Sequence, residues 1–182
     1  ISRQSKKKIS IKKIYSLPKL IRKQINLDLK NIKSKKQSFA NLNFQKIPNV
    51  MGVLNLTPDS FSDGGKFNTK KKGRDYALKM LSSGANIIDI GGESTKPGSR
   101  SIDKKIEWNR IAKIVKYLGK KIPISLDTRK SEVMEKGIKY GIKIINDVSG
   151  LSYDSKTLNI LKKYKIPFVI QHTQGTPQNM QI

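Results

Sequence analysis

Five polar side chains stand at the ends of short apolar runs, where they could gather around a polar ligand. They are Asn55, Asp89, Asp127, Asn146 and His172, and each precedes a loop rich in Gly, Ser, Thr or Pro. Two carboxylates and two amides on one rim suit a heterocycle with several hydrogen-bond donors and acceptors. A single Asp after a strand is more often the N-cap of the next helix. Four such residues are harder to explain as caps, because none stands immediately before its helix.

The elements that must position these side chains follow from the apolar pattern. Short apolar runs closed by a polar residue are typical of buried parallel strands. We expect strands near residues 50–54, 85–90, 122–126, 142–145 and 166–170. We expect helices over 69–83, 103–118, 131–140 and 155–164, with Tyr76, Ile106 and Leu158 among their apolar faces and Ser131 and Ser155 as N-caps. Repeated βα units predict a parallel sheet whose strand C-termini share one side, and that side hosts the site.

Periodicity alone leaves an open doubly wound sheet and a barrel as alternatives. No Gly-x-Gly-x-x-Gly segment and no Walker-type loop follows the first strand, so a dinucleotide or ATP site lacks its fingerprint. The length of 182 residues is short for a complete (β/α)₈ barrel, which typically needs about 250. The absence of Cys and the single His exclude thiol catalysis, Cys-based zinc sites and multi-His metal centres.

The charge is strongly basic and uneven. The chain has 38 Lys and Arg against 13 Asp and Glu, a net charge of +25, and about half of the excess lies in residues 1–46. We interpret 1–46 as a basic N-terminal extension with one helical turn over 20–24 and a short strand over 25–29. We also expect a hairpin that covers one end of the following domain, residues 47–182. Nucleic acid is an alternative partner for this segment, but Lys predominates over the Arg that base reading prefers. No apolar run approaches the length of a membrane span, so we expect a cytoplasmic protein without a membrane partner.

Two long loops carry the most specific pattern. Residues 51–65 and 88–98 resemble the two signature segments of the dihydropteroate synthase family, and residues 124–128, 144–147 and 172–177 resemble three further blocks in the same order. The resemblance covers about residues 48–182. A related alternative is the pterin-binding methyltransferase barrel, but that family lacks the first loop. The resemblance implies an α/β fold, a (β/α)₈ TIM barrel that is truncated here after about the fifth strand.

The resemblance also implies a reaction and roles for the strand-end residues. The family joins p-aminobenzoate to 6-hydroxymethyl-7,8-dihydropterin diphosphate, with release of pyrophosphate, in folate biosynthesis. By similarity Asp127 and Asn146 bind the pterin, and Asp127 also stabilises positive charge as pyrophosphate leaves. Asp89 completes the candidate catalytic set by supporting the loop or the pterin. Asn55 resembles the residue near the diphosphate and its Mg²⁺, a cation that prefers oxygen ligands.

The p-aminobenzoate side of the site is implied in the same way. Thr95 and Pro97 resemble its neighbours, Phe61 belongs to a loop that closes over it, and sulfonamides compete at this position in the family. Lys96 stands where the family usually has Arg, and Lys lacks the planar fork with which Arg makes bidentate contacts. The family pattern continues beyond residue 182 with further pterin and phosphate ligands, so we expect the 182-residue chain to be inactive by itself. A homodimer is also expected, because the family commonly dimerises.

Overall fold

The computed structural model describes residues 11–34, 38–40, 42–43, 48–57, 69–96 and 98–171. The chain divides into two compact units, Ile1–Gln37 and Ser38–Ile182. Among the described residues, no helix combines the length and apolar character needed to cross a membrane.

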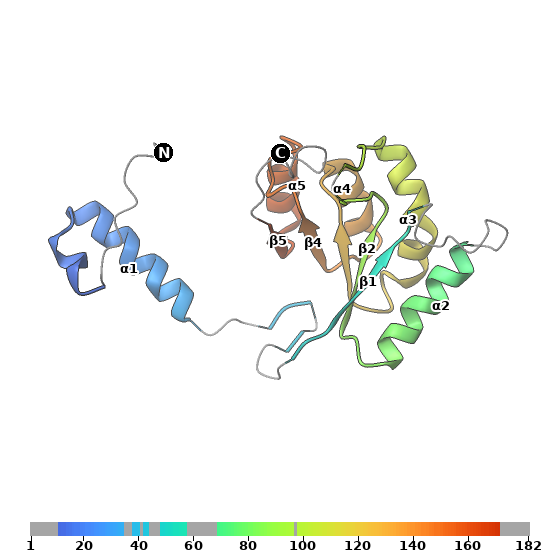
Figure 1. Ribbon diagram of the computed structural model, residues 1–182, viewed down its shortest axis with the longest axis horizontal. Coiled ribbons are helices and arrows are strands. Elements are labelled where there is room, and N and C mark those ends of the chain that lie inside the picture. Colours follow the sequence, from blue (N-terminus) through green and yellow to red (C-terminus); the bar gives the residue numbers. More distant parts are fainter. Residues whose placement is uncertain are drawn as a thin grey trace. The chain divides into compact units, whose positions relative to one another are not determined.

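The first unit is helical (Figure 1). A 3₁₀ helix, η1 (Ile11–Ser16), precedes α1 (Lys19–Lys33), and no residue of α1 is buried. The strand expected over 25–29 is therefore wrong. Ile21, Ile25 and Leu29 recur every four residues, which places them on one side of a helix. Ile25 and Leu29 are part of this four-residue repeat, so their alternation with polar residues does not indicate a strand.

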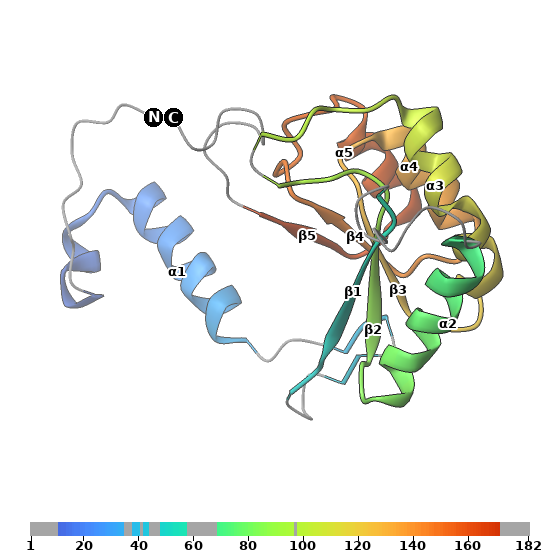
Figure 2. The same ribbon diagram turned by 45° about the vertical axis from the view of Figure 1, so that its right-hand side comes forward.

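The second unit contains a parallel sheet of five strands in sequential order (Figure 2). The strands are β1 (Met51–Asn55), β2 (Ile87–Gly91), β3 (Ile124–Asp127), β4 (Ile144–Asp147) and β5 (Phe168–Ile170). Their connections contain α2 (Thr69–Ser82), α3 (Lys104–Leu118), α4 (Ser131–Lys139) and α5 (Thr157–Tyr164), all on one face of the sheet. A doubly wound sheet carries helices on both faces. The expected barrel is therefore confirmed, with five consecutive strands of a (β/α)₈ architecture.

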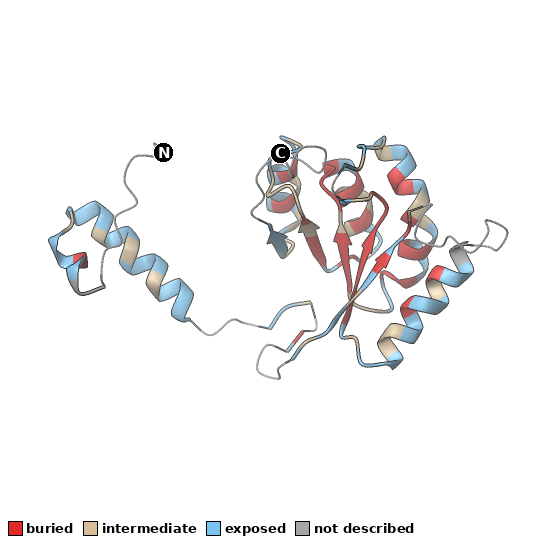
Figure 3. Ribbon diagram, in the orientation of Figure 1, coloured by how far each residue is buried: buried red, intermediate tan, exposed pale blue. Residues whose placement is uncertain are grey.

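The main core lies between the sheet and the helices (Figure 3). It contains the helix-facing strand residues Leu54, Ile88, Ile90, Ile124, Leu126 and Ile145, and the helical residues Ile111, Ile114, Val115, Leu118, Met134 and Leu161. Three residues expected on apolar helix faces, Tyr76, Ile106 and Leu158, are instead about half exposed. On α3 the buried position next to Ile106 belongs to Glu107, which has no solvent exposure.

A short antiparallel bridge lies before the sheet and packs against its N-terminal end. Phe39 and Leu42 form an antiparallel bridge, and the buried Leu42 packs against Ile87 and Ile144 at the starts of β2 and β4. The hairpin expected within residues 1–46 stays a prediction, since the described residues show this single bridge and the packing of Leu42.

The caps expected at Ser131 and Ser155 are wrong, and one carboxylate explains both. Asp154 accepts hydrogen bonds from the backbone N–H groups of Ser131 (2.9 Å) and Lys156 (2.9 Å). Ser131 is consequently the first residue of α4, and α5 begins after Lys156. The side chain of Asp103 caps α3 by accepting from Lys105 N–H at 2.7 Å.

Candidate active site

Four polar or small residues form a row across the C-terminal ends of β1 to β4. Asn55 is in register with Gly91, Gly91 with Asp127, and Asp127 with Asn146. Asp89 lies two residues before Gly91 on β2 and therefore shares its face of the sheet. The Asn146 side-chain amide donates to Asp89 Oδ2 at 3.1 Å. The structure thus brings Asn55, Asp89, Asp127 and Asn146 together, while their roles toward a ligand stay predictions.

Gly91 leaves an opening between two oxygen atoms of this row. A Cβ at this position would lie 3.3 Å from both Asn55 Oδ1 and Asp127 Oδ2. Amide and carboxylate oxygens are the ligands that Mg²⁺ prefers, usually completed by water and substrate phosphate. No group of three or more His, Cys, Asp or Glu side chains suited to a metal occurs within the described residues. A cation held here would accordingly need further ligands from its substrate.

Asp127 in the row and Asp89 behind it are short of positive partners. Burial raises the pKa of Asp127 to about 7, and the negative charges of Asp89, Glu107, Asp147 and Glu93 add to that effect. Burial also raises the pKa of Asp89, which the nearby Ser125 and Asn146 side chains partly offset. Asp89 Oδ1 accepts no hydrogen bond of normal geometry from the described residues. Acids with a raised pKa in a partly or fully buried place are frequent at functional sites.

The residues predicted for p-aminobenzoate lie on the loop after β2 or outside the described part. Thr95 and Lys96 are exposed on this loop, and neither has a contact with the strand-end row that the structure shows. The Lys96 backbone N–H donates to Ser94 Oγ at 3.4 Å. Phe61, Pro97 and His172 lie outside the described residues.

Sequence reasoning missed a second polar cluster beside the row. Glu93, Glu107, Arg129 and Lys130 form a buried ion network between the loops after β2 and β3 and helix α3. One signal was available, since Glu107 stands four residues before Ile111 on the apolar stripe of its helix. A charged residue in such a stripe indicates a buried partner.

Comparison with known proteins identifies relatives of the second unit. Residues 51–182 match the family model described as pterin binding enzyme. The dihydropteroate synthase of Synechocystis sp. is 42% identical over 134 residues, which is 72% of this chain and 46% of the relative. The chain spans about half the length of the curated relatives it matches.

Solved structures give the same relationship. A Clostridium difficile dihydropteroate synthase, determined in the presence of pteroic acid, matches with a TM-score of 0.69 and 42% identity over 73% of this chain and 51% of its own. The Yersinia pestis dihydropteroate synthase in a sulfonamide drug complex matches with a TM-score of 0.70 and 40% identity, over 77% of this chain and 51% of its own.

Proposed function

The chain belongs to the pterin-binding enzyme family, and from this premise we propose that it carries the substrate sites of a dihydropteroate synthase. The observation that supports the proposal best is the row of Asn55, Gly91, Asp127 and Asn146, with Asp89 behind it. These residues offer several hydrogen-bond acceptors and amide donors on one face, at the C-terminal end of a barrel sheet where such enzymes bind substrates.

The pterin ring fits the centre of this row. Its aminopyrimidine presents neighbouring N–H donors, and one carboxylate can accept two of them as a bidentate pair. We assign this role to Asp127, with Asn146 as the mixed donor and acceptor beside it. Asp89 accepts from the Asn146 amide at 3.1 Å and so orients it toward the ligand.

The diphosphate of the pterin substrate would lie near Asn55, together with Mg²⁺. The fit rests on the opening at Gly91, where Asn55 Oδ1 and Asp127 Oδ2 face the same point. A bound Mg²⁺ would neutralise charge on the pyrophosphate leaving group. Asn55 would hold it with one amide oxygen, and the ionised Asp127 would stabilise positive charge on the pterin methylene as the C–O bond breaks.

The second substrate, p-aminobenzoate, would approach from the loop after β2. Thr95 and Lys96 are the described residues of that subsite, with Pro97 and Phe61 as the predicted remainder. Its amine nitrogen forms the new C–N bond and loses one proton as pyrophosphate departs. The cytoplasmic location and the homodimer stay predictions.

Pterin binding as a function of pH tests the proposal. Titration calorimetry with 6-hydroxymethylpterin should show affinity that rises as the pH increases through about 7. The reason is that the ligand's N–H groups bind the ionised form of Asp127, and this buried acid ionises fully only above its pKa.

Two variants complete this test. Asp127→Asn should weaken pterin binding about 100-fold and remove the dependence on pH. Glu132→Gln changes an exposed acid on α4 and should leave both unchanged. A folded chain that binds no pterin, or one whose Asp127→Asn variant binds normally, would contradict the proposed function.

A further inference from the structure

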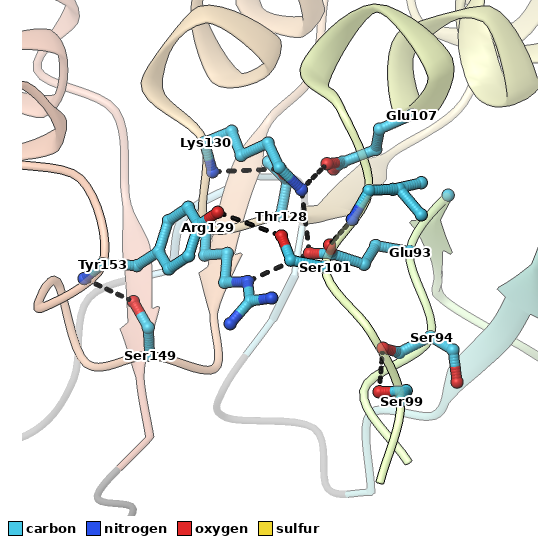
Figure 4. A network of polar contacts seen from close by, with 12 residues as sticks. Glu93, Ser94, Ser99, Ser101, Glu107, Thr128, Arg129, Lys130, Ser149 and Tyr153 are labelled. Atoms are coloured by element: carbon cyan, nitrogen blue, oxygen red, sulfur yellow. Dashed lines mark hydrogen bonds and ion pairs between the residues drawn. The ribbon is translucent and has the colours of Figure 1, made fainter. Parts of the chain in front are cut away.

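The carboxylate of Glu93 joins three segments of the chain (Figure 4). Its Oε1 accepts from the backbone N–H of Ile102 at 2.9 Å. Its Oε2 accepts from Arg129 Nε at 3.0 Å and from Lys130 Nζ at 2.9 Å. One side chain therefore closes the loop from residue 93 to residue 102 and ties it to the loop after β3.

The network around Glu93 is buried and electrically balanced. Lys130 Nζ also donates to Glu107 Oε2 at 2.6 Å, so two acids face two cations. All four side chains are less than 10% exposed. Burial by itself would raise the pKa of Glu93, but the hydrogen bonds from Arg129, Lys130 and Ile102 outweigh it and lower that pKa. Glu93 consequently stays ionised and keeps both oxygens as acceptors near neutral pH.

The position of Glu93 connects the two halves of the candidate site. It follows Gly91 by two residues and directly precedes the loop segment that carries Thr95 and Lys96. Its partner Arg129 follows Asp127 by two residues. The network therefore links the end of β3, where Asp127 lies, to the loop proposed for the p-aminobenzoate subsite.

Further contacts beside the network hold the same loops. Arg110 donates to the Gly92 carbonyl at 2.8 Å, and Ser99 Oγ donates to the Ser94 carbonyl at 2.7 Å. The Tyr153 ring, from the loop after β4, lies 4.1 Å from the Arg129 guanidinium carbon. The Tyr153 hydroxyl is 3.0 Å from Ser101 Oγ on the same β2 loop.

We propose that Glu93 is a positioning residue, which sets the spacing between the p-aminobenzoate loop and the pterin site by binding Ile102 N–H and Arg129 with one carboxylate. The inference rests on the proposed function of these two subsites. It assigns to Glu93 no contact with either substrate. Its effect reaches p-aminobenzoate and competing sulfonamides through the conformation of residues 94–96 and 98–101.

Replacement by glutamine separates this role from packing. Glutamine has the same shape, but it presents one acceptor oxygen where donors from Ile102, Arg129 and Lys130 converge on two. Either orientation of the amide sets N–H groups against N–H groups at one end. Glu93→Gln should release either the loop closure or the link to Arg129.

Hydrogen exchange on the intact 182-residue chain measures the loop directly. In Glu93→Gln, amides of residues 94–96 and 98–102 should exchange about 30-fold faster, while those of β2 and β3 keep their protection. Glu107→Gln is the matched control, because it removes an acid from the same Lys130 but leaves the bonds of Glu93 to Ile102 and Arg129. Arg129→Lys retains the charge and the fold, and should give a smaller acceleration confined to the same loop.

Ligand binding then distinguishes positioning from general stability. Glu93→Gln should weaken p-aminobenzoate, measured in the presence of 6-hydroxymethylpterin, by about tenfold, and 6-hydroxymethylpterin alone by less than twofold. An equal effect of Glu93→Gln and Glu107→Gln on loop exchange would overturn the proposal. Unchanged p-aminobenzoate affinity would also overturn it while pterin binding persists and the proposed function stands. Failure of the unaltered chain to bind pterin would instead count against the proposed function itself.

Discussion

Two groups of buried carboxylates lie at the same end of the sheet and differ in how they are partnered. Asp89 and Asp127 face the open side of the strand-end row, and burial raises the pKa of both. Glu93 is as buried as Asp89, yet two cations and a backbone N–H lower its pKa. All three side chains are carboxylates, so the number of cations and N–H donors beside each one decides the direction of its pKa shift. Cations and a backbone N–H hold the Glu93 carboxylate in place. Asp89 and Asp127 have no such cations, and Asp89 Oδ1 accepts no hydrogen bond of normal geometry from the described residues, so these two acids retain binding capacity for a ligand.

Removing the shared cation of the balanced network should have the largest effect. Lys130→Met leaves Glu107, which has no solvent exposure, and part of Glu93 without a cation. We expect the free energy of unfolding to fall by about 3–5 kcal/mol, as for other broken buried ion pairs. Urea unfolding measures this change.

A surface pair supplies the control for that variant. Lys104 pairs with Glu132 where both side chains are more than 40% exposed, so Lys104→Met should cause no measurable loss of stability. Equal losses in the two variants would mean that burial of the network contributes nothing.

Removing a charge from the strand-end row should raise the stability of the fold, unlike the loss expected at Lys130. Between the ordinary pKa of 3.8 and about 7, the unfolded chain ionises Asp127 while the folded chain keeps it protonated, so ionisation costs stability as the pH rises. Asp127→Asn removes this cost. Its stability advantage over the unaltered chain should be about 2 kcal/mol larger at pH 8 than at pH 5. If this difference in stability stays constant or narrows between pH 5 and pH 8, the ionisation of Asp127 does not cost the fold stability.

A smaller change tests the opening between Asn55 and Asp127. In Gly91→Ala, a Cβ 3.3 Å from two oxygens must displace them by a few tenths of an ångström. Pterin affinity should fall about tenfold, while stability changes by less than about 1 kcal/mol. Gly84→Ala gives the converse, because it has free space around Cβ but a φ of +107°. That variant should lose stability and keep its affinity, and the comparison fails if both variants lose affinity equally.

The smallest effect is expected at the rim of the balanced network. Tyr153→Phe keeps the ring over Arg129 and removes only the hydroxyl that faces Ser101. The loss of stability should be about 0.5 kcal/mol, with slightly faster amide exchange in residues 99–102. If Tyr153→Phe lowers the free energy of unfolding as much as Lys130→Met does, the Tyr153 hydroxyl contributes as much stability as the buried cation.

Much of the second unit was predictable from local patterns. The five strands and four helices lie within a few residues of the predicted ranges. The spacing of apolar residues and the polar residue at each strand end can be recognised within a short segment, without knowledge of the rest of the chain. The positions of Asn55, Asp89, Asp127 and Asn146 on one edge followed from the same reasoning. Local patterns gave a wrong prediction at Ile25 and Leu29, whose spacing fits both a strand and a helix. They also failed at the start of α4, because Asp154, which is distant in the sequence, accepts the hydrogen bond of the Ser131 backbone N–H.

By itself, the sequence determined the order of βα units, the family resemblance and the residue types at each strand end. Only the tertiary structure decided that α2 to α5 cover one face of the sheet and that Asn146 donates to Asp89. It also decided that Glu93, Glu107, Arg129 and Lys130 meet in one buried network. The physical reason is distance along the chain. Glu93 and Arg129 are 36 residues apart, and Asp89 and Asn146 are 57 apart, so their interactions arise only after the sheet has brought them together. The raised pKa of Asp127 is likewise a property of the assembled site, because desolvation and neighbouring charge exist only in the folded chain.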